Sequence, residues 1–448
     1  MQIEYKMLYT QKLFICNITS WLSRRTRHII NVYCSTLTNG NLPKQQKENI
    51  DIREMEELIE IKTELPKMKK KNKAMEYIEK SISCDEEILD IIKKVNPDTS
   101  DIIQLLTDKN ILLEKAQITK LLLIDKDTAA KYVSLIKNDL LKNTCYIAEL
   151  NPGFGILTRE LLKAGVPLIH LYENNLKLHD ILKIICTKYP GKLKLIFNKY
   201  YTLFGNKKTF YIKNDIKKYQ DNFQEIKSKN WEDETCMQII GACDDINIFS
   251  FIIHNTIFRI GFMFYGRPVF YIAVSPSVWH NYNICNNLLT YTYTKVMFKL
   301  MFNFELLGTL NRKAFIPWPQ KKQYKRNTSN LLAKQNYEQL YVIKLEPKAD
   351  IYTQLSPKDW ITFSYFVRHF MHTRRTRVIP ALEKWVPDCG IKLIAKDYTI
   401  YTQFGDLTPT QILELFKEFK SWSDYKYSHF IDSMNNSVGA HNEFEFLK

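Results

Sequence analysis

Two glutamates and two glycines between positions 149 and 173 form the clearest chemical pattern in the sequence. Glu149 closes one short apolar run, Gly153 and Gly155 follow in a turn, and Glu173 closes the next apolar run. Glycine has no Cβ, so a glycine turn lets backbone N–H groups approach a ligand closely. A carboxylate at the end of the second run can accept hydrogen bonds from both hydroxyls of a ribose. The pattern therefore indicates a nucleotide-like ligand.

The segments around these residues must form a strand, a turn, a helix and a second strand. Thr144–Leu150 has the length of a buried strand, and Ile156–Ala164 places its leucines on one face of a helix. Gly165 is a natural helix stop. Val166–Tyr172 is the second apolar run. Together these segments predict half of a nucleotide-binding βαβ unit.

The ligand class follows from what the turn lacks. A dinucleotide fingerprint needs a third glycine where the helix packs on the strand, and this chain has Thr158 there. An acid that closes the strand, a Gly-x-Gly turn and a second acid suit S-adenosylmethionine instead. An ordinary strand-to-helix turn that binds no ligand is the alternative, and the sequence leaves it open.

At these residues the chain resembles the rRNA adenine N6,N6-dimethyltransferase family. The resemblance is carried by Glu149–Thr158, read as ELNPGFGILT, and by Leu171–Glu173, and it extends with diminishing strength from about 121 to about 433. Most members have Gly where this chain has Asn151, and Asn is associated with the mitochondrial branch. The resemblance implies an α/β, Rossmann-like, S-adenosylmethionine-dependent methyltransferase domain with a smaller C-terminal helical lobe.

The resemblance also implies a set of cofactor-binding residues. Phe210–Asp215 is interpreted as a third strand that closes on an acid, and in the family the acid at this place lies beside the adenine ring of the cofactor. The expected cofactor-binding residues are Glu149, Asn151, Gly153, Gly155, Glu173 and Asp215.

The sequence departs from the family at the expected catalytic turn. Active members place Asn-Leu-Pro-Tyr, or Phe in the last position, directly after the fourth strand, which is predicted here at Met237–Gly241. There the Asn side chain and the Pro carbonyl accept hydrogen bonds from the target adenine amine, and the aromatic ring stacks on the flipped base. No catalytic residue is therefore predicted, and the degenerate turn consists of Gly241, Ala242, Cys243 and Asp244.

Composition indicates a polyanionic partner and excludes several classes of protein. The 448 residues contain 64 Lys and Arg against 48 Asp and Glu, a formal charge of +16, which favours a nucleic-acid partner. A basic protein adapted to an organelle interior is the alternative. Nine cysteines without a C-x-x-C pair argue against a zinc ribbon and for free thiols in a reducing compartment. No uncharged apolar run is long enough to insert in a membrane.

An arginine-rich segment lies in the expected helical lobe. Trp360–Leu382 is interpreted as one long amphipathic stretch that contacts phosphates, and the family's lobe has a paired arginine at the corresponding place. A histidine pair in this stretch has no third ligand nearby, so no metal site is predicted. Further along, Thr408 is expected to be the N-cap of the last strong helix, with Pro409 in its first turn. The candidate nucleic-acid contacts are Arg368, Arg374, Arg375 and Arg377.

Composition shifts predict the domain organisation. Residues 1–38 are basic and acid-poor, which is typical of a mitochondrial transit peptide; a basic tail that touches nucleic acid is the alternative. Residues 39–114 form a charged extension, 115–278 the methyltransferase-like domain, 279–433 the helical lobe and 434–448 a polar tail. The expected location is the mitochondrial matrix, in the nucleoid.

Two functions from different classes follow. The first is a mitochondrial transcription initiation factor that binds promoter DNA and the mitochondrial RNA polymerase. The second is an enzyme that dimethylates two adjacent adenines of mitochondrial small-subunit rRNA. Asn151 and the degenerate turn favour the first function, whereas the retained acids and glycines keep the second open.

Overall fold

The computed structural model describes residues 121–143, 145–197, 226–245, 247–283, 292–317, 335–336, 338–373 and 375–439. Several predictions lie outside these residues: the transit peptide, the charged extension, the strand that ends at Asp215, the side chain of Arg374 and most of the polar tail. They stay predictions.

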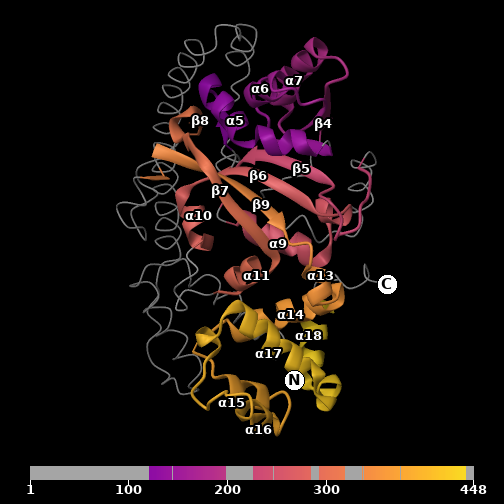
Figure 1. Ribbon diagram of the computed structural model, residues 1–448, viewed down its shortest axis with the longest axis vertical. Coiled ribbons are helices and arrows are strands. Elements are labelled where there is room, and N and C mark those ends of the chain that lie inside the picture. The colour runs from indigo at the N-terminus through magenta and orange to yellow at the C-terminus, as the bar shows by residue number, and fades with distance from the viewer. Residues whose placement is uncertain are drawn as a thin grey trace, which may run out of the picture. The chain divides into compact units, whose positions relative to one another are not determined.

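A seven-stranded mixed sheet is the centre of the described structure (Figure 1). Its spatial order is β4-β3-β2-β5-β6-β9-β7. The first five strands in this order are parallel, and β9 runs antiparallel to both of its neighbours. The strands are β2 (Tyr146–Leu150), β3 (Ile169–Glu173), β4 (Leu193–Phe197), β5 (Met237–Ala242), β6 (Pro268–Val274), β7 (Phe302–Asn311) and β9 (Gln339–Pro347). The predicted α/β, Rossmann-like methyltransferase fold is confirmed.

The central strands are apolar throughout because both faces of the sheet are covered. All seven residues of β6 are buried, as expected for a strand with helices on both sides. Successive side chains alternate between two cores: Phe270 and Ile272 belong to one, and Tyr271 and Ala273 to the other.

Helices cover the two faces unequally. One face packs against α5, α6 and α7. The other packs against α9, α10 and α11, and the same apolar cluster continues into the C-terminal helices. The helices of the first part are α5 (Lys126–Lys142), α6 (Ile156–Lys163), α7 (Leu176–Lys188), α9 (Ile248–Phe258), α10 (Pro276–Asn283) and α11 (Tyr293–Met301).

The C-terminal helices begin after β9. They are α13 (Ile351–Gln354), α14 (Pro357–Phe370), α15 (Val378–Glu383), α16 (Cys389–Ile394), α17 (Pro409–Ser421) and α18 (His429–Gly439), with short 3-10 turns η8 (Phe404–Asp406) and η9 (Ser423–Tyr427). Thr408 caps α17 as predicted: its hydroxyl accepts a hydrogen bond from the N–H of Gln411, whose side chain accepts from the N–H of Thr408. Phe366 of α14 packs against Phe416 of α17, so this lobe has an aromatic core.

Two observations change the expected boundaries. Strands β7 and β9 follow residue 278, the expected end of the methyltransferase-like domain, yet both belong to its sheet. The arginine-rich stretch is not one helix, because α14 ends at Phe370 and a turn separates it from α15. The hydroxyl of Thr376 donates to the Thr373 carbonyl within this turn, and such local hydrogen bonds compete with helix formation.

Candidate functional site

The glycine turn lies at the carboxyl end of β2, where the sequence places it. Asn151, Gly153 and Gly155 all have left-handed backbones, with φ of 51°, 60° and 68°. The N–H of Asn151 donates to the carbonyl of Tyr172 at 3.0 Å, which ties the turn to the end of β3. Asn tolerates this conformation better than other residues with a Cβ, so the residue at position 151 matches its backbone.

Packing also favours glycine at two of these positions. A Cβ on Gly155 would lie 2.4 Å from Cδ1 of Ile185, which belongs to α7, and a Cβ on Gly153 would lie 3.1 Å from Cδ2 of Leu122. Leu122 belongs to β1 (Leu122–Leu123), a short strand that follows the described N-terminus. The glycines are therefore explained in part by this chain's own side chains.

Glu149 is buried below the turn and is protonated near neutral pH. It is 1% exposed, and the hydroxyl of Thr158 donates to its carboxylate at 2.7 Å. The pKa of Glu149 is raised to about 8, mainly by burial and to a smaller extent by the charge of Glu173, while the hydrogen bond from Thr158 acts in the opposite direction. Thr158, which stands where a dinucleotide fingerprint has glycine, is thus the hydrogen-bond donor to the acid of the first strand.

Glu173 ends β3 beside the turn, shortly before α7 begins at Leu176. It is 2% exposed, and its Oε1 accepts hydrogen bonds from the N–H groups of Asn174 and Asn175, each at 2.9 Å. These N–H groups precede the first turn of α7, where a negative charge is favourable. Any contact with a ribose would therefore involve the other carboxylate oxygen.

The expected catalytic turn, Gly241 to Asp244, lies at the same end of the parallel strands as the glycine turn, their carboxyl end. Gly241 pairs with Leu150 in the parallel register, and the residues after it close against β6, where the N–H of Cys243 donates to the carbonyl of Ala273 at 2.9 Å. Cys243 is fully buried, and burial raises the pKa of its thiol far above the usual range. It is not a nucleophile.

Asp244 is the one acceptor side chain of this turn, and it is already engaged. Burial raises the pKa of its carboxyl group, while a hydrogen bond from Ser275 and the charge of Arg312 act in the opposite direction. Its Oδ2 lies 3.9 Å from Nη2 of Arg312. The carboxylate is therefore held by the protein itself.

Arg312 links this turn to the strand that covers the glycines. It lies in η7 (Arg312–Ala314), is 2% exposed, and donates to the carbonyls of Phe315 at 2.7 Å and Pro317 at 2.8 Å. Phe315 belongs to β8 (Phe315–Ile316), which pairs antiparallel with β1. The buried guanidinium of Arg312 thus connects Asp244 with β8, which pairs with β1 beside the glycine turn.

Tyr132 of α5 also holds the turn. It is fully buried, and its hydroxyl lies 2.7 Å from the carbonyl oxygen of Gly241 and 3.0 Å from that of Tyr271. It can donate its one proton to either carbonyl. Neither Tyr132 nor Arg312 was singled out in the sequence, because nothing local marks the contact of Tyr132 with Gly241 or that of Arg312 with Asp244.

Comparison with known proteins identifies the family resemblance. The chain is 27% identical over 366 residues to a protein named dimethyladenosine transferase 2, mitochondrial, from Drosophila melanogaster, covering 71% of this chain and 80% of that protein. The predicted family resemblance is confirmed. This is the mitochondrial branch that Asn151 indicates. No protein-family profile matches the chain.

Two solved structures resemble the described fold. The crystal structure of the 23S rRNA methyltransferase ErmE is 14% identical, with a TM-score of 0.42, and covers 67% of this chain and all of that one. A dimethyladenosine transferase from Plasmodium falciparum is 13% identical, with the same TM-score, and covers 67% of this chain and 97% of that one.

In this relative of dimethyladenosine transferase 2, the candidate nucleic-acid arginines occupy two places. Arg368 lies in the last turn of α14, exposed, with its guanidinium 4.9 Å from the ring of Tyr293. Arg375 and Arg377 are exposed between α14 and α15. No carboxylate lies within ion-pair distance of any of these three among the residues that the structure describes.

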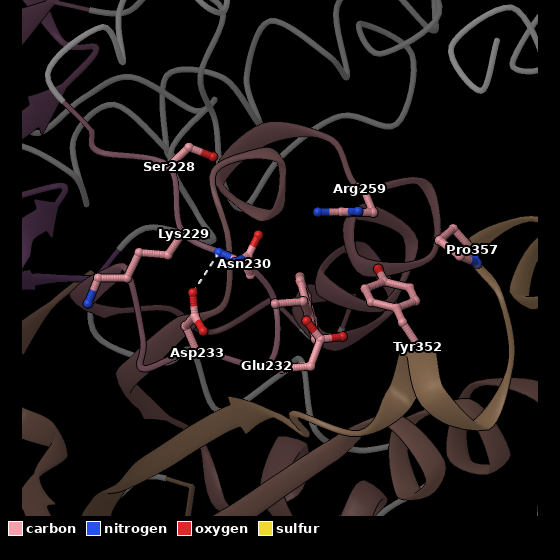
Figure 2. A pocket seen from close by; sticks show the side chains of 9 residues that line it. Ser228, Lys229, Asn230, Glu232, Asp233, Arg259, Tyr352 and Pro357 are labelled. Atoms are coloured by element: carbon pink, nitrogen blue, oxygen red, sulfur yellow. Dashed lines mark hydrogen bonds between the residues drawn. The ribbon is translucent and has the colours of Figure 1, made fainter.

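A hollow lies near the amino ends of the parallel strands, at the end opposite the glycine turn. It has a volume of about 420 Å³, and its lining includes Lys229, Trp231, Arg259 and Tyr352. Figure 2 shows the Arg259 side chain projecting across it beside Tyr352, and the guanidinium lies 5.3 Å from that ring. The lining mixes acids and bases, so the hollow has no single charge that would select a ligand.

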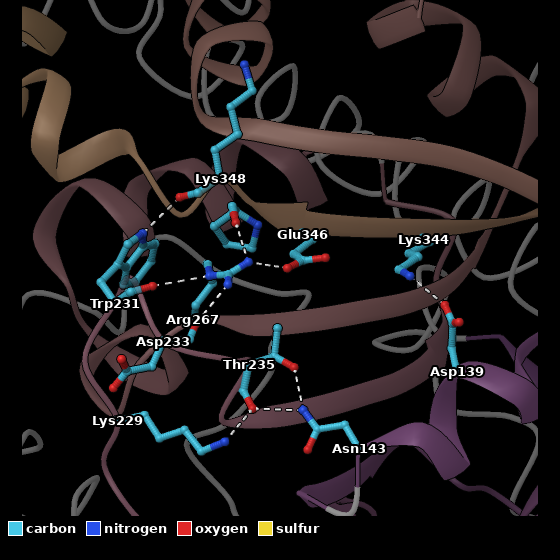
Figure 3. Close-up of polar contacts among 11 residues, drawn as sticks. Asp139, Asn143, Lys229, Trp231, Asp233, Thr235, Arg267, Lys344, Glu346 and Lys348 are labelled. Carbon is cyan, nitrogen blue, oxygen red and sulfur yellow. Dashed lines mark hydrogen bonds and ion pairs between the residues drawn. The ribbon is translucent and has the colours of Figure 1, made fainter.

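Polar contacts of Arg267 close this end of the sheet (Figure 3). Arg267 precedes β6 and forms an ion pair with Glu346 of β9, while its other N–H groups donate to the carbonyls of Trp231 and Asp233. Trp231 in turn donates to the carbonyl of Lys348 at 3.0 Å. The Arg267 side chain therefore fastens β9 to the sheet and is a structural residue.

The described residues contain no group of three or more His, Cys, Asp or Glu arranged to hold a metal ion. They also contain no helix with the length and apolar character needed to cross a bilayer.

Proposed function

We propose that this chain is a mitochondrial transcription initiation factor derived from the rRNA adenine dimethyltransferase fold, which assists the mitochondrial RNA polymerase at promoters. One observation carries the proposal: the turn at the end of β5 has no free side-chain acceptor and no aromatic ring to receive a target adenine. Its single acceptor side chain, Asp244, is half-buried, hydrogen-bonded by Ser275 and paired with Arg312.

Methyl transfer to adenine needs a hydrogen-bond acceptor and an aromatic ring at this turn. The amine of adenine is a poor nucleophile while its lone pair is delocalised into the ring. An acceptor must take hydrogen bonds from the amine at the moment of attack, and an aromatic ring must hold the flipped base. The side chains of Gly241, Ala242 and Cys243 offer neither, and the carboxylate of Asp244 lies 3.9 Å from the guanidinium of Arg312.

S-adenosylmethionine fits the other half of the site at its ribose end. Glu173 supplies a buried carboxylate at the edge of β3, and the left-handed turn from Asn151 to Gly155 presents backbone beside it. Bound there, the cofactor would supply an electrophilic methyl group. Glu149, mostly neutral at pH 7, would hold the turn from below through Thr158 without placing a second full charge beside Glu173. We infer residual, weak cofactor binding.

An active rRNA adenine N6,N6-dimethyltransferase of mitochondrial small-subunit rRNA is the second candidate. The observation that favours it is the retained edge, where Glu149, Glu173 and the three left-handed residues lie together. The name of the Drosophila relative also describes a transferase and a mitochondrial protein. That name, with the acid-poor leader, supports a mitochondrial location, and we propose the matrix nucleoid. Promoter DNA or mitochondrial rRNA would be the nucleic-acid partner.

Three measurements on the purified protein test the proposal: calorimetric titration with S-adenosylmethionine, methyl transfer to a mitochondrial rRNA stem-loop, and promoter-dependent initiation with the mitochondrial polymerase. We expect weak binding that Glu173→Ala abolishes, because the loss of a charged acceptor costs about 1.5 to 3 kcal/mol, or one to two decades of affinity. Glu173→Gln is the matched variant, since its amide oxygen can still accept from Asn174 and Asn175.

We expect methyl transfer at background and initiation that persists in both Glu173 variants. Robust dimethylation of the stem-loop that is lost in Glu173→Gln would overturn the proposal and establish the enzyme. A protein that neither methylates nor supports initiation would contradict both candidates.

A further inference from the structure

The C-terminal lobe holds an exposed tyrosine next to the turn between α14 and α15, which carries Arg375 and Arg377. Tyr401 is 67% exposed and its neighbour Ile400 is 52% exposed. The guanidinium carbon of Arg377 lies 5.4 Å from the centre of the Tyr401 ring, a distance at which a cation is attracted to an aromatic face. These residues are 24 positions apart in the sequence, so the fold brings them together.

Backbone pairing fixes this contact. The N–H of Val378 donates to the carbonyl of Thr402, and the N–H of Phe404 donates to that of Thr376, each at 2.9 Å. Arg377 and Gln403 form the antiparallel bridge between them. Residues 376–378 are therefore paired with residues 402–404. This pairing fixes the position of Arg377 relative to Tyr401.

A local turn also orients Tyr401. The hydroxyl oxygen of Thr399 accepts hydrogen bonds from the N–H groups of Tyr401 at 3.3 Å and Thr402 at 3.2 Å, while the Thr402 hydroxyl accepts from the N–H of Thr399 at 2.9 Å. An exposed aromatic ring on an ordered turn loses little conformational freedom when it binds a ligand.

From this geometry we infer that Tyr401 and Arg377 form a stacking site for one unpaired base of a single-stranded nucleic acid, with Arg375 on a neighbouring phosphate. The guanidinium covers one face of the ring, and the base stacks on the opposite face. Aromatic side chains that alternate with cationic ones are how proteins hold single strands, because every base has a π face while the phosphates need positive charge.

The ligand class follows from the same contacts. A base inside a duplex is already stacked on both faces and cannot reach a protruding ring, so this site selects an unpaired strand. Arg375 and Arg377 have no carboxylate partner among the described side chains, which leaves them available for phosphate. The inference rests on the proposed function, since it assumes that the protein handles nucleic acid, and it names the form that the lobe binds.

Fluorescence anisotropy with the full chain tests the inference, using mixed-sequence oligonucleotides as single-stranded DNA, single-stranded RNA and duplex DNA. Stacking on an aromatic ring is worth about 1–3 kcal/mol per base, so Tyr401→Ala should weaken single-strand binding about 5- to 150-fold and change duplex binding less than about twofold. Tyr401→Phe should bind as the natural chain does. Arg375→Gln should lower the slope of log K against log salt by about 0.7 on single strands, because it removes one phosphate contact.

Tyr427 is the matched control, because it is 88% exposed and no described guanidinium lies over its ring. Tyr427→Ala should leave all three affinities unchanged. Circular dichroism and thermal unfolding confirm that each variant is folded. A comparison of the DNA and RNA arms shows which single strand is preferred.

Full single-strand affinity in Tyr401→Ala, or an equal loss on duplex, overturns the inference and leaves the proposed function standing. A natural chain that binds none of the three oligonucleotides overturns the proposed function as well.

Discussion

Replacing Glu149 with Gln should remove the part of the pH dependence of folding stability that comes from the Glu149 carboxyl group. The buried carboxyl has a pKa of about 8 in the folded protein, against 4.5 in an exposed glutamate. Between these two pH values the unfolded chain releases a proton that the folded protein keeps. Stability from this group is therefore complete below about pH 4.5 and is lost as the pH rises toward 8. The whole contribution is on the order of 5 kcal/mol.

Gln is the informative substitute because its amide oxygen can still accept the hydrogen bond from Thr158 at this buried position. Its NH₂ group brings new donors into the same space, at a cost of about 1–3 kcal/mol that does not depend on pH. Glu149→Gln should therefore be less stable than the natural chain near pH 5 and more stable near pH 8.

The assay is urea denaturation followed by circular dichroism, at intervals between about pH 5 and pH 8. The difference in unfolding free energy between the two proteins should change by several kcal/mol over this range. Glu414→Gln is the control, since that side chain is 62% exposed and its pair with Lys417 is on the surface; its difference should stay flat. A flat difference for Glu149→Gln as well would show that Glu149 is ionised in the folded protein and would refute the reasoning.

Two further predictions concern the edge of the site. Gly155→Ala should destabilise the protein by about 2–4 kcal/mol, because the new Cβ strains the left-handed backbone and would lie 2.4 Å from Ile185. Gly165→Ala is the control for strain alone, since Gly165 has φ of 95° and nothing within 4 Å of the new Cβ. Equal thermal shifts for the two variants would refute the packing argument. Arg312→Met should cost about 3–5 kcal/mol, because the half-buried Asp244 loses its cation and the carbonyls of Phe315 and Pro317 lose their donor. Adding Asp244→Asn to Arg312→Met should recover part of that loss in chemical denaturation, and strict additivity would contradict the coupling.

The sequence predicted those parts of the site that depend on neighbouring residues. The glycine turn could be located because left-handed backbone favours Gly and Asn, and because apolar runs on each side have the lengths of strands. The N-cap at Thr408 follows from two adjacent residues and their helix chemistry. In these cases the physical cause lies within a few positions of the residue, so the pattern is visible in the sequence.

The parts that the sequence did not predict depend on distant partners. The stretch after Trp279 was interpreted as helical, whereas Phe302–Asn311 and Gln339–Pro347 are strands because each pairs along the whole of its length. Strand propensity depends on such context. β4 at Leu193–Phe197 was likewise missed, and the strand expected at Phe210–Asp215 lies outside the described residues. The state of Asp244 depends on Arg312, which contacts it only after β7 has formed.

The place of β9 in the sheet constrains the order in which the chain can fold. Among the strands that the structure describes, β9 comes last in the sequence, yet it lies between β6 and β7. A chain that is synthesised or translocated N-terminus first can assemble β2 to β6, but the outer edge of β6 keeps its backbone groups unpaired until residues 339–347 arrive. Exposed apolar strand edges invite association with other chains. A newly synthesised molecule therefore passes through a period in which a holding chaperone would matter most, and premature termination before Gln339 would leave that edge open permanently.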